Sequence, residues 1–424
     1  MKVLVVGGGG REHVLAWKLS KSPSVDKIYC TPGNAGIQKI AECVNIDPRD
    51  IASLVEFAQE NDIDLTVPGP EQPLVEGLVD EFRANDLLAF GPDKKAARIE
   101  GSKAFSKDLM ARHGIPTARF DVFSSPANAQ KFADNLGYPV VIKADGLAAG
   151  KGAIICNDAD DAAKAIDTIM VEQKFGKAGE HVVVEEFLEG TELSVLAIVS
   201  GMDILMLPPS QDHKAVYDGD KGPNTGGMGA YSPVSAVSDK ELASIERDVI
   251  VQTVHAMVSE GCTFSGVLYA GLMLTPKGPH VLEFNCRFGD PEAQVVIPRY
   301  RGDFGKLLYS AAAGKLGKEN IVPDIDPRSA VCVTMASGGY PVSYKKGLPI
   351  SGIDAVEDDD VTVFHAGTRM KLDQIVTDGG RVLGVTALGN SVTEARSRAY
   401  AAVSSIEFEG AHFRTDIGRR ERGQ

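Results

Sequence analysis

Cysteine pairs, long apolar runs and an excess of basic residues are all missing from this 424-residue chain. Its six cysteines stand far apart, with no CxxC pair and no ligand-like cluster with histidine. That spacing argues against a disulfide framework or a zinc site and favours a reduced protein of the cytoplasm. No run of about 18 apolar residues exists, so we expect no membrane span. The opening MKVLVVGGGG turns glycine-rich too early for a secretory signal peptide.

The net charge of −14 argues against a nucleic-acid partner, because an anionic molecule repels a phosphate backbone. Any phosphate that this chain binds must therefore be held by a local group of cations and a metal ion. Hydrophobic residues make up 43% of the chain and charged residues 24%, which is ordinary for a globular protein. The length suits roughly two to four structural units, each with its own core.

The amino-terminal residues predict the first βα unit of a Rossmann-like sheet. Lys2–Val6 is expected to form a strand, residues 7–10 a glycine turn and Arg11–Lys21 a helix. The functional interpretation places an anionic group on the helix amino terminus with Arg11 as its charge partner, and a tight turn without a ligand is the alternative. An NAD site is disfavoured, because GGGG followed by REH fits GxGxxG poorly and no acid ends the next strand, Lys27–Cys30.

Two further loops follow predicted strands of the same sheet. Thr31–Gly36 (TPGNAG) comes after the second strand, and residues 68–73 (PGPEQP) come after the third, Leu65–Val67. Parallel sheets bind ligands where such strand ends meet, so we expect these loops to gather on one edge. A helix over Leu74–Asn85 and a short strand over Leu88–Phe90 are predicted to complete the unit.

The stretch VVIKADGLAAGKG, residues 140–152, has the features of a polyphosphate grip. Lys143 ends a predicted buried strand, and Lys151 follows eight positions later, so two cations bracket a glycine loop. The loop would let backbone N–H groups approach an anion closely through Gly146, Gly150 and Gly152. It is not a Walker A loop, which needs Ser or Thr where Gly152 stands. A surface turn that happens to carry lysines is the alternative.

The stretch VLEFNCRFGDPE, residues 281–292, predicts a metal site. Glu283 and Asn285 are two apart on a predicted strand, so both side chains point to one face. A carboxylate and an amide oxygen suit Mg²⁺, which takes few protein ligands and completes its shell with substrate phosphates. Arg287 continues the alternation and offers a bidentate cation for phosphate or carboxylate. An edge strand with outward polar residues is the alternative, but it would not explain the RFGDPE turn.

Other charged residues carry weaker signals. Lys103 and Lys107 lie one turn apart on a helix predicted over Ser102–His113, where a solvated face is the simpler interpretation. Glu185 and Glu186 end a predicted strand, and a pair of acids there is usually a solvated edge. That strand nevertheless resembles the Lys143 strand, because both end in charged residues. The similarity predicts a nucleotide between the two strands.

A polar, glycine-rich region follows, with QDHK at 211–214 and DGDKGPNTGGM at 218–228. Segments of this composition inside a compact domain are usually functional or disordered. His213 within it is as suited to donating a hydrogen bond as to acting as a base. The last part of the chain, after a proline-punctuated linker at 323–327, carries no obvious chemistry apart from HAGT at 365–368.

Together these motifs resemble those of the phosphoribosylamine–glycine ligase family, within the ATP-grasp superfamily, from Met1 to about Gly418. The matching segments are REH after a glycine turn, PGNAG, GPE, GSKAF, IKADGLAAGKG, EEFLEG, SQDHK, GPNTGGMGAYSP and EFNCRFGDPE. The resemblance implies an α/β and α+β multidomain fold. Its parts would be an N-terminal Rossmann-like domain (1–101), a central ATP-grasp domain (102–326) with a mobile lid at about 117–192, and a small C-terminal α+β domain (327–424).

The resemblance also implies a reaction of de novo purine biosynthesis. ATP would phosphorylate the glycine carboxylate, and the amine of 5-phosphoribosylamine would attack the resulting glycyl phosphate. The products would be glycinamide ribonucleotide, ADP and phosphate. Phosphoryl transfer depends on positioning and charge neutralisation, which matches a sequence rich in lysine, arginine and glycine loops and without an evident nucleophile.

The family pattern assigns roles to the residues at matching positions. The ATP-binding residues would be Lys103, Lys143, Gly146, Gly150, Lys151, Gly152, Glu185, Glu186, Phe187, Leu188 and Glu192. Mg²⁺ or Mn²⁺ would be held by Glu283 and Asn285. The catalytic residues, which position glycyl phosphate and the sugar phosphate, would be Arg287, Asp290, Asp212 and Lys214. Phosphoribosylamine would contact Gly10, Arg11, Asn34, Glu71 and His213.

Two other functions stay open. Another ATP-grasp ligase, such as a carboxylase of a purine-pathway ribonucleotide, is disfavoured by QDHK and RFGDPE. An NAD-dependent oxidoreductase would use the first βα unit. The strand GVLYAGLML lacks the acid that many ATP-grasp enzymes carry there, so the number of metal ions stays open too. We expect a monomer; a transient contact with the enzyme that supplies phosphoribosylamine is left open.

Overall fold

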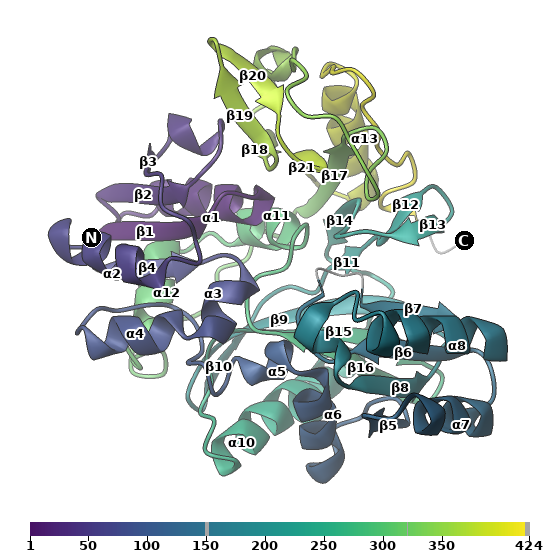
Figure 1. Cartoon of the computed structure of the whole chain (residues 1–424). Coiled ribbons are helices and arrows are strands. Elements are labelled where there is room, and N and C mark those ends of the chain that lie inside the picture. Colours follow the sequence, from purple (N-terminus) through teal and green to yellow (C-terminus); the bar gives the residue numbers. More distant parts are fainter. Residues whose placement is uncertain (149–151, 320, 420–424) are drawn as a thin grey trace.

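The computed structural model describes residues 1–148, 152–319 and 321–419 and shows three connected units (Figure 1). The amino-terminal unit lies at the left of that view, the carboxy-terminal unit at the top and the central unit at the bottom. Within the described ranges, no helix is both long and apolar enough to cross a membrane. Gly150 and Lys151, which we predicted to bind ATP, lie outside the described residues.

A four-stranded parallel sheet forms the amino-terminal unit, in the order β3–β2–β1–β4. Residues Val3 to Val6 are fully buried, as expected of a parallel strand covered on both faces. The strands are β1 (Lys2–Gly7), β2 (Lys27–Pro32), β3 (Glu42–Cys43) and β4 (Leu65–Pro68). The helices are α1 (Gly10–Ser20), α2 (Ile51–Glu60), α3 (Glu71–Glu76) and α4 (Leu78–Ala84).

Three details of this unit differ from the prediction. The single helix predicted over Leu74–Asn85 is divided into α3 and α4, because Gly77 adopts a left-handed φ of 104°. The strand predicted over Leu88–Phe90 is reduced to one bridge between Thr66 and Ala89. Helix α2, which begins after an Asp50 cap, was not predicted at all.

Two four-stranded antiparallel sheets form the central unit. The Lys143 sheet has the order β5–β8–β6–β7, and the Glu283 sheet has the order β10–β9–β15–β16. The strands of the Lys143 sheet are β5 (Phe120–Phe123), β6 (Val140–Ala144), β7 (Ala153–Cys156) and β8 (Val182–Glu186). The strands of the Glu283 sheet are β9 (Thr191–Ser200), β10 (Asp203–Met206), β15 (Ser265–Thr275) and β16 (Gly278–Asn285).

Helices cover both of these sheets (Figure 1). The helix predicted over Asp239–Glu260 is continuous, but its middle turn, Glu246–Val251, is a π-helix. The helix that begins at Ala159 likewise ends in a π-helical turn. The helices of the central unit are α5 (Arg98–Gly101), α6 (Lys103–Arg112), α7 (Pro126–Leu136), α8 (Ala159–Ile166), α9 (Asp239–Ile245), α10 (Gln252–Ser259), α11 (Ala293–Val296) and α12 (Phe304–Ala312).

The carboxy-terminal unit has a five-stranded sheet in the order β11–β14–β17–β21–β18. Two of its strands, β11 (Gln211–Asp212) and β14 (Gly229–Ser232), lie at the start of the polar region and directly after it, within residues 102–326 that we predicted as the central domain. Chain order therefore does not separate these two units. The other elements are β17 (Ser329–Ala336), β18 (Val361–His365), β21 (Arg381–Gly389), α13 (Val392–Val403) and the hairpin β19 (Thr368–Lys371) and β20 (Gln374–Thr377). A small ribbon, β12 (Ala215–Tyr217) with β13 (Lys221–Asn224), lies beside it.

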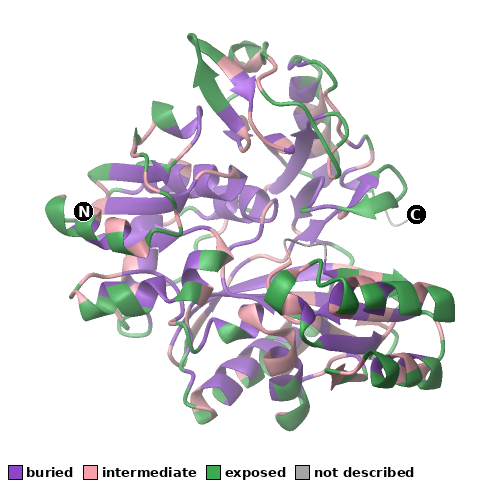
Figure 2. Cartoon of the chain, viewed as in Figure 1, coloured by how far each residue is buried: buried purple, intermediate pink, exposed green. Residues whose placement is uncertain are grey.

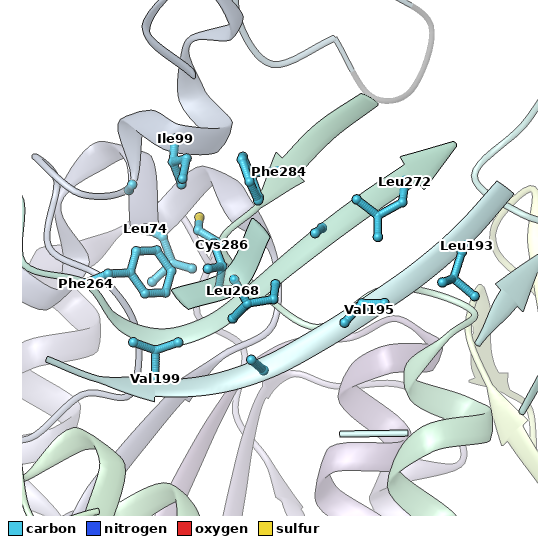
Figure 3. Close-up of a cluster of buried hydrophobic side chains, with 14 of the residues drawn as sticks. Leu74, Ile99, Leu193, Val195, Val199, Phe264, Leu268, Leu272, Phe284 and Cys286 are labelled. Carbon is cyan, nitrogen blue, oxygen red and sulfur yellow. The ribbon is translucent and has the colours of Figure 1, made fainter. Parts of the chain in front are cut away.

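The largest apolar core runs from the amino-terminal helices through the Glu283 sheet into the carboxy-terminal unit. Figure 3 shows part of it, where Leu74 and Ile99 lie on the side of the sheet that carries Leu268 and Phe284. The Lys143 sheet has a separate core between its strands and helices α7 and α8, whose outer faces are exposed (Figure 2). It therefore packs as a unit of its own on the rest of the molecule.

Two buried histidines join the amino-terminal unit to the carboxy-terminal one. The backbone N–H of His365 donates to Nδ1 of His13 at 2.7 Å. Burial, helped by the neighbouring His365, lowers the pKa of His13 to about 3, and burial together with Lys39 lowers the pKa of His365 to about 4. Both rings are therefore neutral at physiological pH.

This interface predicts a loss of stability in acid. The unfolded chain binds protons on these histidines below their ordinary pKa of 6.5, whereas the folded chain does not until about pH 4 or lower. Stability is thus fully present above pH 6.5 and falls as the pH drops toward 4, by about 3 kcal/mol per histidine. Thermal unfolding followed by circular dichroism should show a shallower acid decline in His13→Gln, while the exposed control His255→Gln keeps the wild-type slope.

Candidate active site

One cavity of about 490 Å³ receives side chains from all three units. Lys143 and Glu283, from the two different sheets of the central unit, both line it. Of the residues that we predicted, the cavity also brings together Arg11, Glu71, Lys103, Gly146, Gly152, Asp212, Lys214, Asn285, Arg287 and Asp290. The described lining does not include Gly10, Asn34, Glu185, Glu186, Phe187, Leu188, Glu192 or His213.

Lysines of the Lys143 sheet and of α6 form one wall. Lys143 and Lys107 both form ion pairs with the buried carboxylate of Glu185, the second at 2.5 Å. The Lys143 ammonium also donates to the carbonyl of Leu282 at 3.1 Å, which ties this sheet to the Glu283 sheet. Lys103 donates to the carbonyl of Gly146 at 2.9 Å, so it lies at the start of the glycine loop.

The Glu185 side chain is buried and paired with two lysines. The family resemblance implies that Glu185 and Leu188 contact adenine largely through backbone groups, and the Glu185 carboxylate, which is only 2% exposed, is left to neutralise Lys107 and Lys143. Burial opposes its ionisation, and the two ammonium groups outweigh burial, so its pKa lies below the usual value. Any contact of this segment with adenine would have to come from backbone groups. Glu186 accepts from the backbone N–H of Arg119 at 2.9 Å.

Glu283 and Asn285 lie on β16 as the alternation predicted. The Glu283 side chain is exposed to the cavity, and the residue opposite it on β15 is Gly271, which has no side chain to offer. The enclosing walls disfavour its charge, but Lys103, Lys143 and other nearby cations outweigh them and lower its pKa. Asn285 is buried, and its Oδ1 accepts from Nη2 of Arg287 at 3.0 Å.

Arg287 lies between two acids. Its guanidinium forms ion pairs with Glu100 at 3.0 Å and with Glu71 at 3.3 Å. Glu100, which the sequence analysis missed, is fully buried and also accepts from the backbone N–H of Cys286 at 2.7 Å. Arg11 donates to the carbonyl of Phe288 at 2.8 Å, so the amino-terminal helix touches the RFGDPE turn.

The amino terminus of α1 is occupied by its own side chain. The Glu12 carboxylate accepts from the backbone N–H of Gly9 at 2.5 Å and from Nε of Arg11 at 3.1 Å. A dinucleotide phosphate would need this same position in a Rossmann turn. These contacts argue against an NAD site at this turn.

Asn34 and His213 are engaged away from the cavity. The Asn34 amide donates to the carbonyls of Gly8 and His365, both at 2.9 Å, and accepts from two backbone N–H groups of its own loop. It thereby joins the amino-terminal loop to the carboxy-terminal unit. The His213 ring is buried and lies 6.1 Å from the ring of Tyr231.

A second charged group surrounds Lys214. Its ammonium lies 2.7 Å from Glu192 and 3.2 Å from Asp212. Burial raises the pKa of Asp212 to about 7; Lys214 counteracts this shift, and the nearby carboxylates of Glu292 and Glu192 add to it. Tyr269 donates to Glu292 at 2.6 Å and completes the group.

These observations first define a class of protein. A cavity between two antiparallel sheets, with lysines on one wall and an acid–amide pair on the facing strand, is the arrangement of an ATP-grasp ligase. Family models agree along most of the chain: phosphoribosylglycinamide synthetase N domain matches residues 1–100, its ATP-grasp (A) domain 101–293 and its C domain 330–420. The chain belongs to the phosphoribosylamine–glycine ligase family of purine biosynthesis.

Individual relatives are similar over nearly the whole chain. Phosphoribosylamine–glycine ligase of Caldanaerobacter subterraneus is 51% identical over 98% of this chain and 99% of its own length, and that of Vibrio cholerae is 50% identical over 99% and 98%. The crystal structure of the Thermotoga maritima ligase is 34% identical, with a TM-score of 0.85 over 98% of this chain and 100% of that one. A biotin carboxylase from Campylobacter jejuni, 13% identical over 97% and 92%, shares the fold alone, with a TM-score of 0.75.

The buried lysine pair yields a test of its own. Glu185→Ala should destabilise the protein by about 3–5 kcal/mol, because Lys107 and Lys143 would lose their shared counter-charge inside the protein. Chemical denaturation followed by fluorescence measures this loss. Glu189→Ala, an exposed acid in the following loop, is the matched control and should change stability by less than about 0.5 kcal/mol. Equal effects of the two variants would contradict the role of Glu185.

Proposed function

We propose that this cavity joins glycine to 5-phosphoribosylamine, using ATP and passing through glycyl phosphate. The observation that carries the proposal is that Lys143 and Glu283 line one cavity, although they come from different sheets. Family membership supplies the substrates, and the cavity supplies the charges that a triphosphate and a sugar phosphate need.

The nucleotide lies between the Lys143 sheet and β16 in this proposal. Lys103 is suited to the phosphates, because among the described residues no carboxylate lies within ion-pair distance of it. Gly146 and Gly152 lie beside the phosphates, and the segment at about 117–192 closes as a lid over ATP. Backbone groups of residues 185–188 contact adenine, and Glu192 contacts the ribose.

Glu283 and Asn285 are proposed to hold Mg²⁺ or Mn²⁺. The residues fit, since the Glu283 carboxylate is ionised and exposed to the cavity and Asn285 adds a neutral oxygen. When bound, the metal neutralises charge on the phosphates. No group of three or more His, Cys, Asp or Glu able to hold a metal occurs among the described residues, so we expect the nucleotide to supply further ligands.

The acceptor substrate lies toward Arg11, Glu71, Arg287 and Asp290. A glycine carboxylate oxygen attacks the γ-phosphorus, and the bond to ADP breaks. The amine nitrogen of phosphoribosylamine then attacks the glycyl carbonyl carbon, phosphate leaves, and the nitrogen gives up a proton. Asp212 is placed to accept that proton, because it lines the cavity beside Lys214 and titrates near neutrality.

The deciding experiment measures ADP release with glycine and phosphoribosylamine each omitted in turn. Continued ADP release over many turnovers should require both, because glycine without phosphoribosylamine supports only the single turnover that forms glycyl phosphate. ADP release that depends on bicarbonate instead would indicate a carboxylase. Protection against heat by NADH but not by MgATP would indicate an oxidoreductase.

Replacing the Glu283 carboxylate tests the part of the cavity that we assign to the metal and the nucleotide. Glu283→Gln should lower turnover by at least about 100-fold, because the amide no longer carries the charge that attracts the metal. The thermal unfolding midpoint should be unchanged, since Glu283 is exposed to the cavity. Glu56→Gln, an exposed acid on α2, is the control and should be fully active. Normal turnover of the Glu283 variant at ordinary Mg²⁺ would remove this residue from the metal site.

The pH profile tests Asp212. Only the ionised carboxylate accepts a proton, so kcat/KM should rise with pH through about 7, the pKa of this group. Asp212→Asn should lower kcat/KM by about 100-fold or more and remove the rise. Asp239→Asn, an exposed residue in the first turn of α9, should keep the wild-type profile. If kcat/KM still rises through about pH 7 in the Asp212 variant, the group that titrates is another residue.

We further propose that the protein acts as a monomer in the cytoplasm. Its substrates are small molecules, and neither nucleic acid nor membrane is among its partners in this proposal. The enzyme that supplies phosphoribosylamine is the one macromolecule whose transient contact would be useful, because that amine is labile.

A further inference from the structure

The carboxy-terminal unit reaches the cavity with two side chains that the sequence analysis did not select. Arg381 is the first residue of β21, and Tyr340 lies in the loop after β17. Both line the cavity, together with residues of the loop 224–226. The unit that carried no obvious chemistry in the sequence therefore contributes directly to the site.

Gly226 is held on both sides by these two residues. Its backbone N–H donates to the Tyr340 hydroxyl at 3.1 Å, and its carbonyl accepts from Nη1 of Arg381 at 2.7 Å. A Cβ at position 226 would lie 3.0 Å from Cζ of Arg381. A side chain at position 226 would press on the guanidinium and displace it by a few tenths of an ångström, so glycine is the residue that lets the two groups lie this close without a shift.

The same guanidinium fixes Asp290. Nη1 of Arg381 donates to the Asp290 carbonyl at 2.6 Å, and Nη2 donates to its carboxylate at 3.0 Å. The other carboxylate oxygen accepts from Gln294 at 2.7 Å. Asp290 is thereby held at both its backbone and its side chain, and two donors set the direction of its carboxylate.

These contacts lie at the acceptor end of the cavity. Lys143 contacts the carbonyl of Leu282, whereas Asp290 follows five residues after Asn285, beyond the end of β16. Asp290 lies instead against the amino-terminal turn, because a Cβ built on Gly10 would be 3.5 Å from its carboxylate. Arg381 therefore acts far along the chain from the lysines assigned to ATP.

We propose that Arg381 is a positioning residue for the acceptor substrate, which holds Asp290 and Gly226 where the amine-bearing sugar phosphate binds. The proposal rests on the proposed function, in which Asp290 contacts that substrate. Tyr340 holds Gly226 as well, because its hydroxyl accepts from the Gly226 N–H. The planar guanidinium donates to three acceptors, which are the Gly226 carbonyl, the Asp290 carbonyl and the Asp290 carboxylate. A lysine ammonium lacks this planar arrangement of donors.

The test compares substrate dependence with nucleotide binding. Arg381→Ala should lower kcat/KM for phosphoribosylamine by about 100-fold, the effect of displacing one positioning group, while the Kd for MgADP measured by calorimetry stays within about threefold. Arg381→Lys should lose about 10-fold, because the charge remains and the planar fork is lost. Arg369→Ala, a half-exposed arginine of the neighbouring β19, is the matched control and should be fully active.

A double-variant cycle separates positioning from general support. If Arg381 acts through Asp290, Arg381→Ala combined with Asp290→Asn should be no worse than the poorer single variant. Losses that multiply, or a Kd for MgADP that rises as much as the KM for phosphoribosylamine, would overturn the proposal. Gly226→Ala keeps Arg381 and displaces its guanidinium by only a few tenths of an ångström, so its loss of kcat/KM should be smaller than that of Arg381→Ala; an equal or larger loss would overturn the proposal.

The same measurements distinguish a failure of the proposed ligase function from a failure of the proposed role of Arg381. A wild-type protein that releases ADP over many turnovers without phosphoribosylamine would remove both the proposed function and the role of Arg381. If the wild-type protein catalyses the ligase reaction and Asp290→Asn is fully active, the proposed roles of Asp290 and Arg381 are both rejected. The ligase function then still stands.

Discussion

The ammonium group of Lys143 is the contact on which the geometry of the site depends. It pairs with Glu185 in its own sheet and donates to the Leu282 carbonyl of the facing strand. The wall that carries Lys143 is thereby held next to Glu283, one residue further along. Because the Lys143 sheet has its own apolar core, such polar contacts between the sheets, rather than a shared core, determine how the walls of the cavity face each other.

At the other end of the cavity, too, cationic side chains are paired with carboxylates. Arg287 is matched by Glu71 and Glu100, Arg381 by Asp290, and Lys214 by Asp212 and Glu192. Several cations can be gathered around one cavity only if carboxylates keep them from repelling one another before the substrates arrive. A protein with a net charge of −14 can thus hold anionic substrates at a site whose local charge differs from that of its surface.

The amino-terminal unit shows how one side chain can change what a common fold binds. Its parallel sheet and glycine turn have the form of a dinucleotide site, yet Glu12 occupies the helix amino terminus. The carboxylate satisfies the N–H group that a phosphate would use. The unit therefore contributes walls to the cavity, through Arg11 and Glu71, instead of a cofactor site.

Much of this site was predictable because its signals are local. Alternation along VLEFN places Glu283 and Asn285 on one face, and the buried run before Lys143 marks a strand, whatever surrounds them. Glu100, Tyr340 and Arg381 have no such local pattern. The ion pairs of the Glu185 carboxylate have no local signal either, because its sequence neighbours do not reveal that Lys107 and Lys143 converge on it.

Sequence alone determined the family and its class of chemistry, an ATP-grasp ligase, since the glycine loops, spaced lysines and acid–amide pair form motifs that are written into short stretches of the chain. It also determined the longer strands, such as β1, β6, β15 and β16, because an apolar run or a period of two is a property of the chain itself. Only the tertiary structure decided which charges are paired, which strands the polar region lends to the carboxy-terminal sheet, and that Arg381 meets Asp290 from 91 residues away. Those contacts depend on how separately folded elements pack, and no local pattern in the chain records that packing.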